Sequence, residues 1–428
     1  GRAGARGIPF ACLAAGDDPP SFVGRGGLGA VLGRLGLTAI AIRADPVEPD
    51  LSENHGRLLR LLARSPRLRA RAEGGTLEAA GALAARGDLA RTGRGPVLSP
   101  AEARTWSSEL AAGDRPKRGC DGCPTPCGLV FERGFPPVFP GEATRLQGAR
   151  FGALYALGPN LGLARAEDAL ALLSACDAAG LDAIETGSVL ALLADRSERP
   201  IAGDRDALLA RIEDLVEGRG EGKLLALGAR GMARELGIEA GVRTARGQGA
   251  RADASLAAVL GQCAGARGSD SMRTTPFLLA DASPSRLREL LAPIPLPRGA
   301  EDPRDPIGKG RIVWWHENLM AAIDATGFCA FSAAGLLADG VCDLDELAAA
   351  IALACIEPRN ELRPELSTGR ALLAAGASIV AVARDLGRRY GARAEDDTPE
   401  WAREALSHPG MWPEYATMRG LDASGGPS

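Results

Sequence analysis

The chain has 428 residues, of which 46% are hydrophobic and 24% are charged, enough for two or three globular domains. Its 50 Lys and Arg nearly balance its 54 Asp and Glu, with a net charge of -4 spread along the chain, so no nucleic-acid-binding surface is predicted. No apolar run reaches the length of a membrane span, and nine sparse cysteines favour metal-bound thiolates in a reduced, cytoplasmic protein over a disulfide framework.

Residues 7–45 form the only βαβ-like pattern: a strand, a loop, a Gly-rich turn, a short helix and a second strand. Gly24, Gly26 and Gly29 spell G-x-G-x-x-G, and with Asp45 beyond the second strand they raise the alternative of a nicotinamide-dependent dehydrogenase. The match is weak, because the loop DDPPSF separates the motif from the first strand and the helix is short. The same glycines would also allow close packing of the helix on the strand.

From about residue 55 the apolar residues recur with a helical period, and Gly and Pro mark the helix ends. Two irregular stretches, 113–148 and 239–310, interrupt the helices, which continue to Gly420. We therefore predict a mainly α protein with a short α/β segment at the N-terminus and two helical domains. The predicted parts are residues 1–45, 46–240 and 241–428.

The first irregular stretch holds Cys120, Cys123 and Cys127 in a C-x2-C-x3-C run whose short spacers and two prolines favour convergence of three thiolates. Three soft ligands at this spacing suit an iron–sulfur cluster or zinc. Zinc would require a second close pair of ligands, and the three histidines, His55, His316 and His408, are far away in sequence. A cluster with one remote cysteine fits better than zinc or a chance crowding of thiols. Spacing leaves the fourth ligand open among Cys12, Cys176, Cys263, Cys329, Cys342 and Cys355.

Several blocks of sequence follow one another along the chain: GRGGLGAVLGRLGLTAIAI, CDGCPTPCG, ALGPNLGL, DAAGLDAIETG and WWHENLMAAIDATGFCAFS. In this order they resemble the tungsten-dependent aldehyde ferredoxin oxidoreductase family. The resemblance implies the two helical domains of the C-terminal part of that family. It also implies an oxidoreductase that oxidises an aldehyde or related oxo compound at a tungsten (or molybdenum) bis-pterin centre and passes electrons through a [4Fe-4S] cluster to ferredoxin or a similar carrier.

Two of the blocks share the pattern D-x-x-G-[LF]-[CD], and each copy in the family embraces one pterin. The resemblance thus assigns Asp177, Asp182, Asp324 and Phe328 to the pterins and Cys329 to the fourth cluster position. An Asp before a Gly turn is also a common feature of helix C-termini. In the N-terminal block the resemblance places Arg25, Gly26 and Gly27 against the pterin phosphates, where absent side chains admit the ligand.

Three departures from the family concern activity. The family has a long N-terminal base domain that covers the cofactor. The sequence of this chain starts at a position that corresponds to the last part of that domain. We therefore expect either a fragment or a separate chain that supplies the base domain. Gly152 stands where the family has a Glu, and Ser271 aligns with its active-site His. The candidate replacement acids Asp270, Glu142 and Glu185 also fit solvated or capping carboxylates, and His316 fits a packed or surface residue of a helix. The alternative function is therefore a non-catalytic iron–sulfur electron-transfer or scaffold subunit.

Overall fold

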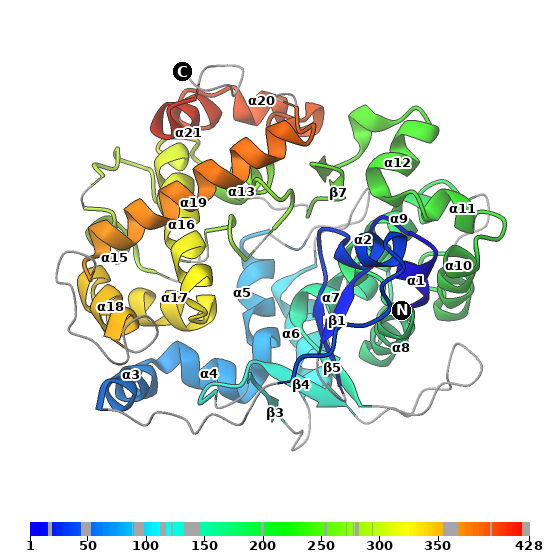
Figure 1. Ribbon diagram of the computed structural model, residues 1–428, viewed down its shortest axis with the longest axis horizontal. Coiled ribbons are helices and arrows are strands. Elements are labelled where there is room, and N and C mark those ends of the chain that lie inside the picture. Colours follow the sequence, from blue (N-terminus) through cyan, green and yellow to red (C-terminus); the bar gives the residue numbers. More distant parts are fainter. Residues whose placement is uncertain are drawn as a thin grey trace. The chain divides into compact units, whose positions relative to one another are not determined.

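The computed structural model describes residues 1–15, 19–43, 53–87, 89, 98–111, 117–120, 123–131, 146–197, 201–251, 255–270, 272–276, 278, 282–292, 294–353, 367–393 and 396–421. Figure 1 shows that helices dominate these residues, which confirms the predicted mainly α fold. The chain packs into two compact units, one of residues 1–44 and 71–253 and the other of residues 45–70 and 254–428. The division into three parts stays a prediction. No described helix is both long and apolar enough to cross a bilayer.

The first unit contains short strands and a larger set of helices. The strands are β1 (Leu13–Ala15), β2 (Ser21–Val23), β3 (Lys117–Arg118), β4 (Gly128–Phe131), β5 (Gln147–Ala149), β6 (Thr244–Ala245) and β7 (Gln248–Gly249). The helices are α1 (Arg2–Ala5), α2 (Leu28–Arg34), η1 (Gly75–Ala79), α5 (Ala80–Ala85), α6 (Pro100–Ala111), α7 (Phe151–Leu157), η2 (Pro159–Leu161), α8 (Ala166–Ala179), α9 (Ala183–Ala194), α10 (Arg205–Glu217), α11 (Gly222–Leu225), α12 (Gly228–Glu235) and η3 (Glu239–Gly241). Helix α4 (Pro66–Gly74) carries the chain from the second unit into the first.

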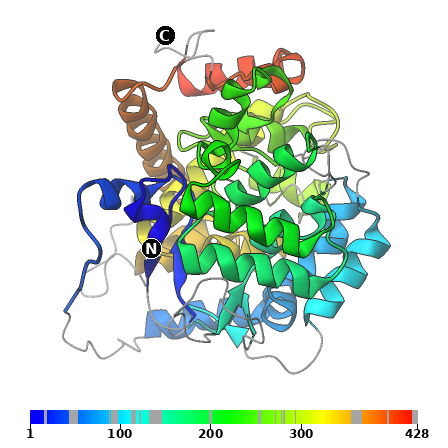
Figure 2. The same ribbon diagram turned by 90° about the vertical axis from the view of Figure 1, so that its right-hand side faces the viewer.

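The core of the first unit is built around α8 and α9. Both helices are rich in Ala and Leu and are buried on most of their circumference, as expected for helices that are apolar all round. Helices α7 and α10 pack on them, and α8 and α10 lie side by side in Figure 2. Leu154, Leu172, Leu190 and Ile212 contribute side chains with no exposed surface to this core.

The N-terminal segment is simpler than the predicted βαβ unit. Strand β1 pairs with β2 in an antiparallel hairpin, with Leu13 opposite Val23, so its hydrogen bonds are satisfied locally. Residues 37–43 are not a strand, and Ile40 and Ile42 are 65% and 87% exposed. The prediction of a second strand over 37–45 was wrong within these described residues, because none of them pairs with a neighbouring strand, and an apolar alternation forms a strand only with such a partner.

The second unit is helical: α3 (Glu53–Arg64), α13 (Leu256–Ala264), α15 (Pro284–Leu290), α16 (Lys309–Thr326), α17 (Ala330–Ala338), α18 (Leu344–Ile351), α19 (Gly369–Arg389), η7 (Glu400–Ala402), α20 (Arg403–Leu406) and α21 (Trp412–Arg419). Helix α16 is its centre. It is buried on almost every side and contacts α13, α19 and α21. In Figure 1 it appears in yellow beside α19 in orange.

Two glycines set the close approach of the helices around α16. A Cβ at Gly376 of α19 would lie 1.8 Å from the backbone oxygen of Asn318. A Cβ at Gly310 of α16 would lie 2.5 Å from the backbone nitrogen of Tyr415 on α21. A side chain at either position would force the helices apart, because backbone atoms cannot move aside as a flexible side chain can.

This packing predicts opposite effects for the same substitution at two positions of α19. Gly376→Ala should lower the free energy of unfolding by about 1–3 kcal/mol or more, because the added methyl meets backbone. Gly387→Ala should raise it by up to about 1 kcal/mol, because the nearest atom is the Ala392 Cβ at 3.7 Å and Ala favours a helix. Urea denaturation checks both, and equal effects would contradict the close approach.

Candidate functional site

The cysteine loop of the first unit is held by a small sheet. Cys120 follows β3 and Cys127 precedes β4, and these two strands pair antiparallel, with Arg118 opposite Gly128. Strand β5 completes the sheet on the other side of β4. The paired strands hold both ends of the loop.

Within the loop, backbone hydrogen bonds give the cysteines a defined turn. The Cys123 N–H donates to the Cys120 carbonyl at 3.0 Å, and the Thr76 N–H donates to the Cys127 carbonyl at 3.0 Å. Gly119 lies close to the loop, because a Cβ there would be 2.9 Å from the Cys123 Cβ. Cys120 is exposed, and Cys123 and Cys127 are half-buried. Asp121 and Gly122 lie outside the described residues.

The loop offers three cysteine thiols, and in their thiolate form these are the ligands that iron–sulfur clusters use. In the part of the chain that the structure describes, no three His, Cys, Asp or Glu side chains are grouped as metal ligands. Cys329 is in the second unit, where it is the exposed N-cap of α17. The cluster and its assignment to Cys120, Cys123, Cys127 and Cys329 therefore stay predictions, and Cys355 lies outside the described residues.

The Gly-rich segment places Arg25 on two carboxylates. Its Nε donates to Asp182 Oδ2 at 3.2 Å, and one terminal nitrogen donates to Glu185 Oε2 at 3.1 Å and to the Gly249 carbonyl at 2.9 Å. Gly26 and Gly27 follow with φ of 99° and 71°, which favour glycine. A Cβ at Gly27 would also lie 2.1 Å from the Pro9 carbonyl oxygen, whereas one at Gly26 would meet nothing within 4 Å. Gly27 thus serves close packing, and the backbone at Gly26 is open.

Asp182 begins α9. Its Oδ1 accepts hydrogen bonds from the backbone N–H groups of Ile184 and Glu185, at 2.9 and 3.2 Å, so both carboxylate oxygens have protein partners. Such an N-cap satisfies donors that the helix itself cannot. The predicted contacts of Arg25 and Asp182 with a pterin stay predictions, and in the structure the two residues also stabilise the fold.

Glu185 is almost fully buried. It accepts hydrogen bonds from the backbone N–H groups of Ala229 and Gly249, at 2.7 and 2.6 Å, in addition to the bond from Arg25. Burial raises the pKa of Glu185, while Arg25 and the two backbone donors oppose the rise. The prediction of a solvated or capping carboxylate at Glu185 was wrong, because the side chain is buried. Nothing in the sequence connects Glu185 with residues 25, 229 and 249, so this network could not be found there.

Both copies of the D-x-x-G pattern end a helix. Gly180 and Gly327 are left-handed C-caps of α8 and α16, with φ of 76° and 77°. Asp177 accepts a hydrogen bond from Gln147 Nε2 at 2.6 Å. The repeated pattern therefore has a structural role, and its proposed role in pterin binding is additional to it.

Asp324, in the second copy, is bound by Arg273. The Nε and Nη2 of Arg273 both donate to Asp324 Oδ2, at 3.1 and 2.6 Å. The Asp324 side chain is still 39% exposed, and Phe328 beyond it is half-buried. No motif in the sequence marks Arg273, which lies far from Asp324 along the chain.

The structure describes some of the positions at which the sequence departs from the family, and some of the candidate replacement acids. Gly152 lies in the first turn of α7, where a Cβ would meet the Ile184 side chain at 3.6 Å. Asp270 accepts from the Met272 N–H at 3.2 Å and pairs with Arg267, so it is a turn-forming carboxylate. Ser271 and Glu142 lie outside the described residues. His316 is buried in α16, as a helix-packing residue, and burial lowers its pKa to about 3.

Comparison with known proteins adds a family and a fold. A family model described as aldehyde ferredoxin oxidoreductase, domains 2 and 3, matches residues 57–428. The tungsten-containing aldehyde ferredoxin oxidoreductase of Pyrococcus furiosus is 29% identical to this chain over 258 residues. The match covers 55% of this chain and 41% of the relative, so the chain spans about two fifths of the relative's length.

Among solved structures, the chain resembles the active site complex BamBC of benzoyl coenzyme A reductase in complex with 1,5-dienoyl-CoA. The TM-score is 0.70, with 16% sequence identity, and the match covers 100% of this chain and 71% of that chain. At this identity the likeness shows a shared fold.

The double role of Asp182 can be measured against a simpler cap. Asp182→Ala removes both the N-cap of α9 and a partner of Arg25, whereas Asp204→Ala removes only the N-cap of α10. The control should cost about 1 kcal/mol of stability. Asp182→Ala should cost about 2 kcal/mol or more, because it also removes a counter-charge from the half-buried Arg25. Chemical denaturation checks this, and equal costs would mean that the Arg25 pair contributes nothing.

Neutral His316 should make the fold sensitive to acid. In the unfolded chain the imidazole binds a proton as the pH falls through 6.5, but in the folded chain it does so only near pH 3. Between these values stability should therefore fall with falling pH, by up to about 1.4 kcal/mol per pH unit. In His316→Gln this dependence should be shallower. Parallel curves for the two proteins, measured by denaturant unfolding from pH 7 to 4, would contradict the lowered pKa.

Proposed function

Because this chain belongs to the aldehyde ferredoxin oxidoreductase family, we propose that it is an oxidoreductase that oxidises an aldehyde or related oxo compound at a tungsten (or molybdenum) bis-pterin centre. The electrons leave through a [4Fe-4S] cluster to ferredoxin or a similar carrier. The observation that carries the proposal is the C-x2-C-x3-C loop, held at both ends by paired strands, in a chain of this family.

In this proposal the three cysteines of the loop and Cys329 are the cluster ligands. The exposed thiol of Cys120 and the half-buried thiols of Cys123 and Cys127 can bind iron only as thiolates. The turn from Cys120 to Cys123 limits how far these two thiols can separate, because it is closed by a backbone hydrogen bond. Cys329 is exposed at the start of a helix, so its thiol is accessible to an iron ion.

The pterin contacts are proposed for residues that keep accessible surface. The exposed Asp324 carboxylate can accept hydrogen bonds from the amino and ring N–H groups of a pterin, and Phe328 offers an apolar contact beside it. At the Gly-rich segment, the open backbone at Gly26 can approach a phosphate. Arg25 stands next to it with its charge already shared between Asp182 and Glu185, so we propose that it positions this segment and adds positive potential. The bound centre supplies the two-electron chemistry.

A second candidate function is a non-catalytic iron–sulfur electron-transfer or scaffold subunit. It is favoured by Gly152, which leaves no carboxylate at the position of the expected acid. A partner chain would fit either function, since BamBC is a complex and a separate chain could supply a base domain. Metal analysis separates the two: iron with tungsten or molybdenum supports the enzyme, and iron alone supports the subunit.

The cluster assignment predicts a specific loss on substitution of the remote cysteine. Anaerobically purified protein should contain about four iron atoms per chain, and Cys329→Ala should contain about three or fewer, because one iron loses its ligand. Cys342→Ala is the matched control, since its thiol is buried in the same unit, and it should keep the full iron content.

Iron analysis and the visible and paramagnetic-resonance spectra of the cluster measure this effect. An unchanged cluster in Cys329→Ala would exclude Cys329 as a ligand. Absence of iron from the unsubstituted chain, even after reconstitution with iron and sulfide, would refute the proposal as a whole.

A further inference from the structure

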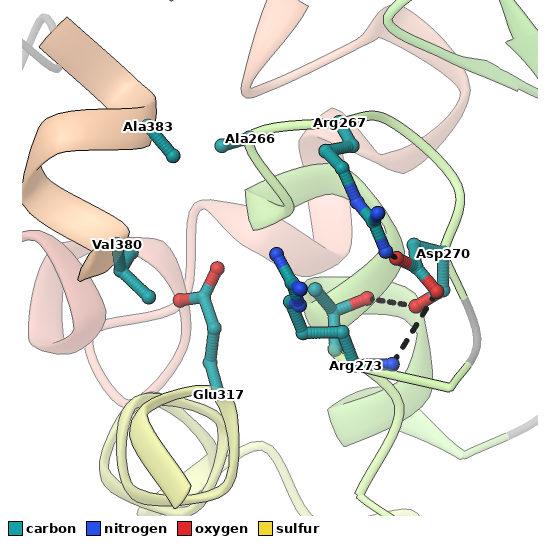
Figure 3. Close-up of a pocket in the computed structure, with 8 residues that line it drawn as sticks. Ala266, Arg267, Asp270, Arg273, Glu317, Val380 and Ala383 are labelled. Atoms are coloured by element: carbon teal, nitrogen blue, oxygen red, sulfur yellow. Dashed lines mark hydrogen bonds and ion pairs between the residues drawn. The ribbon is translucent and has the colours of Figure 1, made fainter. Parts of the chain in front are cut away.

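A cavity inside the second unit is too small for a substrate or a cofactor. Figure 3 shows it between α16, α19 and the loop after α13, with Glu317 and Val380 on its walls. Its volume is about 10 Å³, which is room for about one water molecule. Arg273 at its edge is already bound to Asp324. The outer surface of this unit carries the stronger candidate for a further site.

Six arginines lie close together in the sequence of α3 and α4, although the whole chain has a net charge of -4. They are Arg57, Arg60, Arg64, Arg67, Arg69 and Arg71. No Asp or Glu occurs from residue 54 to residue 72, and the function proposed above uses none of the six arginines. A local excess of positive charge attracts a partner of opposite charge.

Two of the six arginines are already neutralised within the protein. Arg67 Nε lies 2.7 Å from Asp339 Oδ1, and an Arg71 nitrogen lies 3.2 Å from Glu78 Oε1. The other four are exposed and form no ion pair with a carboxylate of the described residues, and we refer to them as the arginine surface: Arg57, Arg60, Arg64 and Arg69. The three on α3 are spaced by three and four residues, so they share one face of that helix.

The opposite face of α3 is packed into the core of the second unit. Leu58 and Leu62 are 8% and 5% exposed and belong to one apolar cluster with residues of α17 and α18. A helix that binds a membrane surface inserts its apolar face into the lipid, and here that face is occupied. No Phe, Tyr or Trp occurs from residue 54 to residue 72, so the segment offers no side chain of these types for stacking on nucleic-acid bases. These features favour an acidic protein as the partner.

The arginine surface is attached to α17, the helix whose N-cap is Cys329. The Ser65 hydroxyl, between α3 and α4, donates to Asp339 Oδ2 at 2.6 Å, and Asp339 is the C-cap of α17. Leu68 packs on Gly335 of α17, where a Cβ would lie 2.8 Å from the Leu68 Cδ2. Because a helix rises about 1.5 Å per residue, Gly335 is about 9 Å from Cys329 along α17. A partner on this surface would therefore lie near the residue proposed as the fourth cluster ligand.

The charge of the expected electron carrier complements this surface. In an iron–sulfur carrier the thiolates that hold the cluster outweigh the positive charge of its core, so the cluster is a net anion. Complexes that transfer electrons bury small interfaces, and opposite charges guide the two proteins together. Four exposed arginines on two short helices fit an interface of this kind.

We propose that the arginine surface is the docking site of an acidic iron–sulfur electron carrier, which takes electrons from the cluster one at a time. This inference rests on the proposed function for the source of the electrons. In each step the reduced cluster loses one electron and the oxidised carrier gains it, so no further reactant is needed. The arginines attract and orient the carrier, and they do not contact the reacting atoms.

Two triple variants with the same loss of charge test the proposal. The surface variant combines three substitutions on α3: Arg57→Gln, Arg60→Gln and Arg64→Gln. The control variant combines three substitutions of exposed arginines elsewhere in the second unit: Arg298→Gln, Arg370→Gln and Arg403→Gln. Both variants should fold, because the substituted side chains are exposed and Gln favours a helix about as well as Arg.

The first measurement is stopped-flow electron transfer from the dithionite-reduced chain, freed of dithionite, to an oxidised acidic ferredoxin. At low salt the second-order rate constant should fall by about 10-fold or more in the surface variant and by less than about 3-fold in the control variant. The difference should shrink as salt is raised to about 0.5 M, because salt screens exposed charges. Transfer to a small neutral quinone should be equal in all three proteins. Equal rates with ferredoxin for the two variants would overturn the proposal.

The second measurement is binding of the same ferredoxin to each chain by biolayer interferometry, which requires neither turnover nor a reduced cluster. The dissociation constant should rise by about 10-fold or more in the surface variant and change little in the control variant. An unsubstituted chain that holds no iron would refute the proposed function, while this binding result would still decide the docking site. If the arginine surface binds phosphatidylglycerol vesicles or single-stranded RNA but no ferredoxin, the proposal is wrong.

Discussion

The fold depends on burying carboxylates against arginines from distant parts of the chain. In the first unit Arg25 holds Asp182 and Glu185, and in the second Arg419 holds Glu317. A charged group can be buried without a large cost only when a partner charge and further hydrogen bonds accompany it. Here backbone N–H groups and a tyrosine hydroxyl donate to the carboxylates, and an asparagine side chain accepts from Arg419. Each pair also fixes one segment on another: the Gly-rich segment on α9, and α21 on α16.

These pairs change the interpretation of the residues assigned to the pterins. Asp182 caps a helix, and Asp324 is bound by Arg273, so neither carboxylate is free to reorient toward a ligand. A ligand that uses them would meet side chains whose directions are already set by the protein, which lowers the entropy cost of binding. The same arrangement means that substitution of such a residue lowers stability as well as cofactor binding. Activity alone therefore cannot distinguish the two roles.

Local patterns in the sequence were sufficient for part of this structure. The C-x2-C-x3-C run and the two D-x-x-G helix ends are short, so spacing alone predicts a turn with three thiols and left-handed caps at Gly180 and Gly327. The helical period predicted the mainly α fold for the same reason. The strand over 37–45 failed because a strand also needs a partner, and that information lies outside the segment. Arg25 with Glu185, and Arg273 with Asp324, join residues far apart in sequence, and no periodicity encodes such contacts.

The proposed chemistry requires separate routes for electrons and protons, and the chain treats the two differently. Electron transfer needs ligands whose spacing is fixed over a few residues, and the C-x2-C-x3-C loop supplies three thiols at such a spacing. Proton transfer needs only a group of suitable basicity beside a water molecule, and several positions around one reactive volume can provide it. A glycine at position 152 is therefore compatible with activity if another carboxylate takes over the proton.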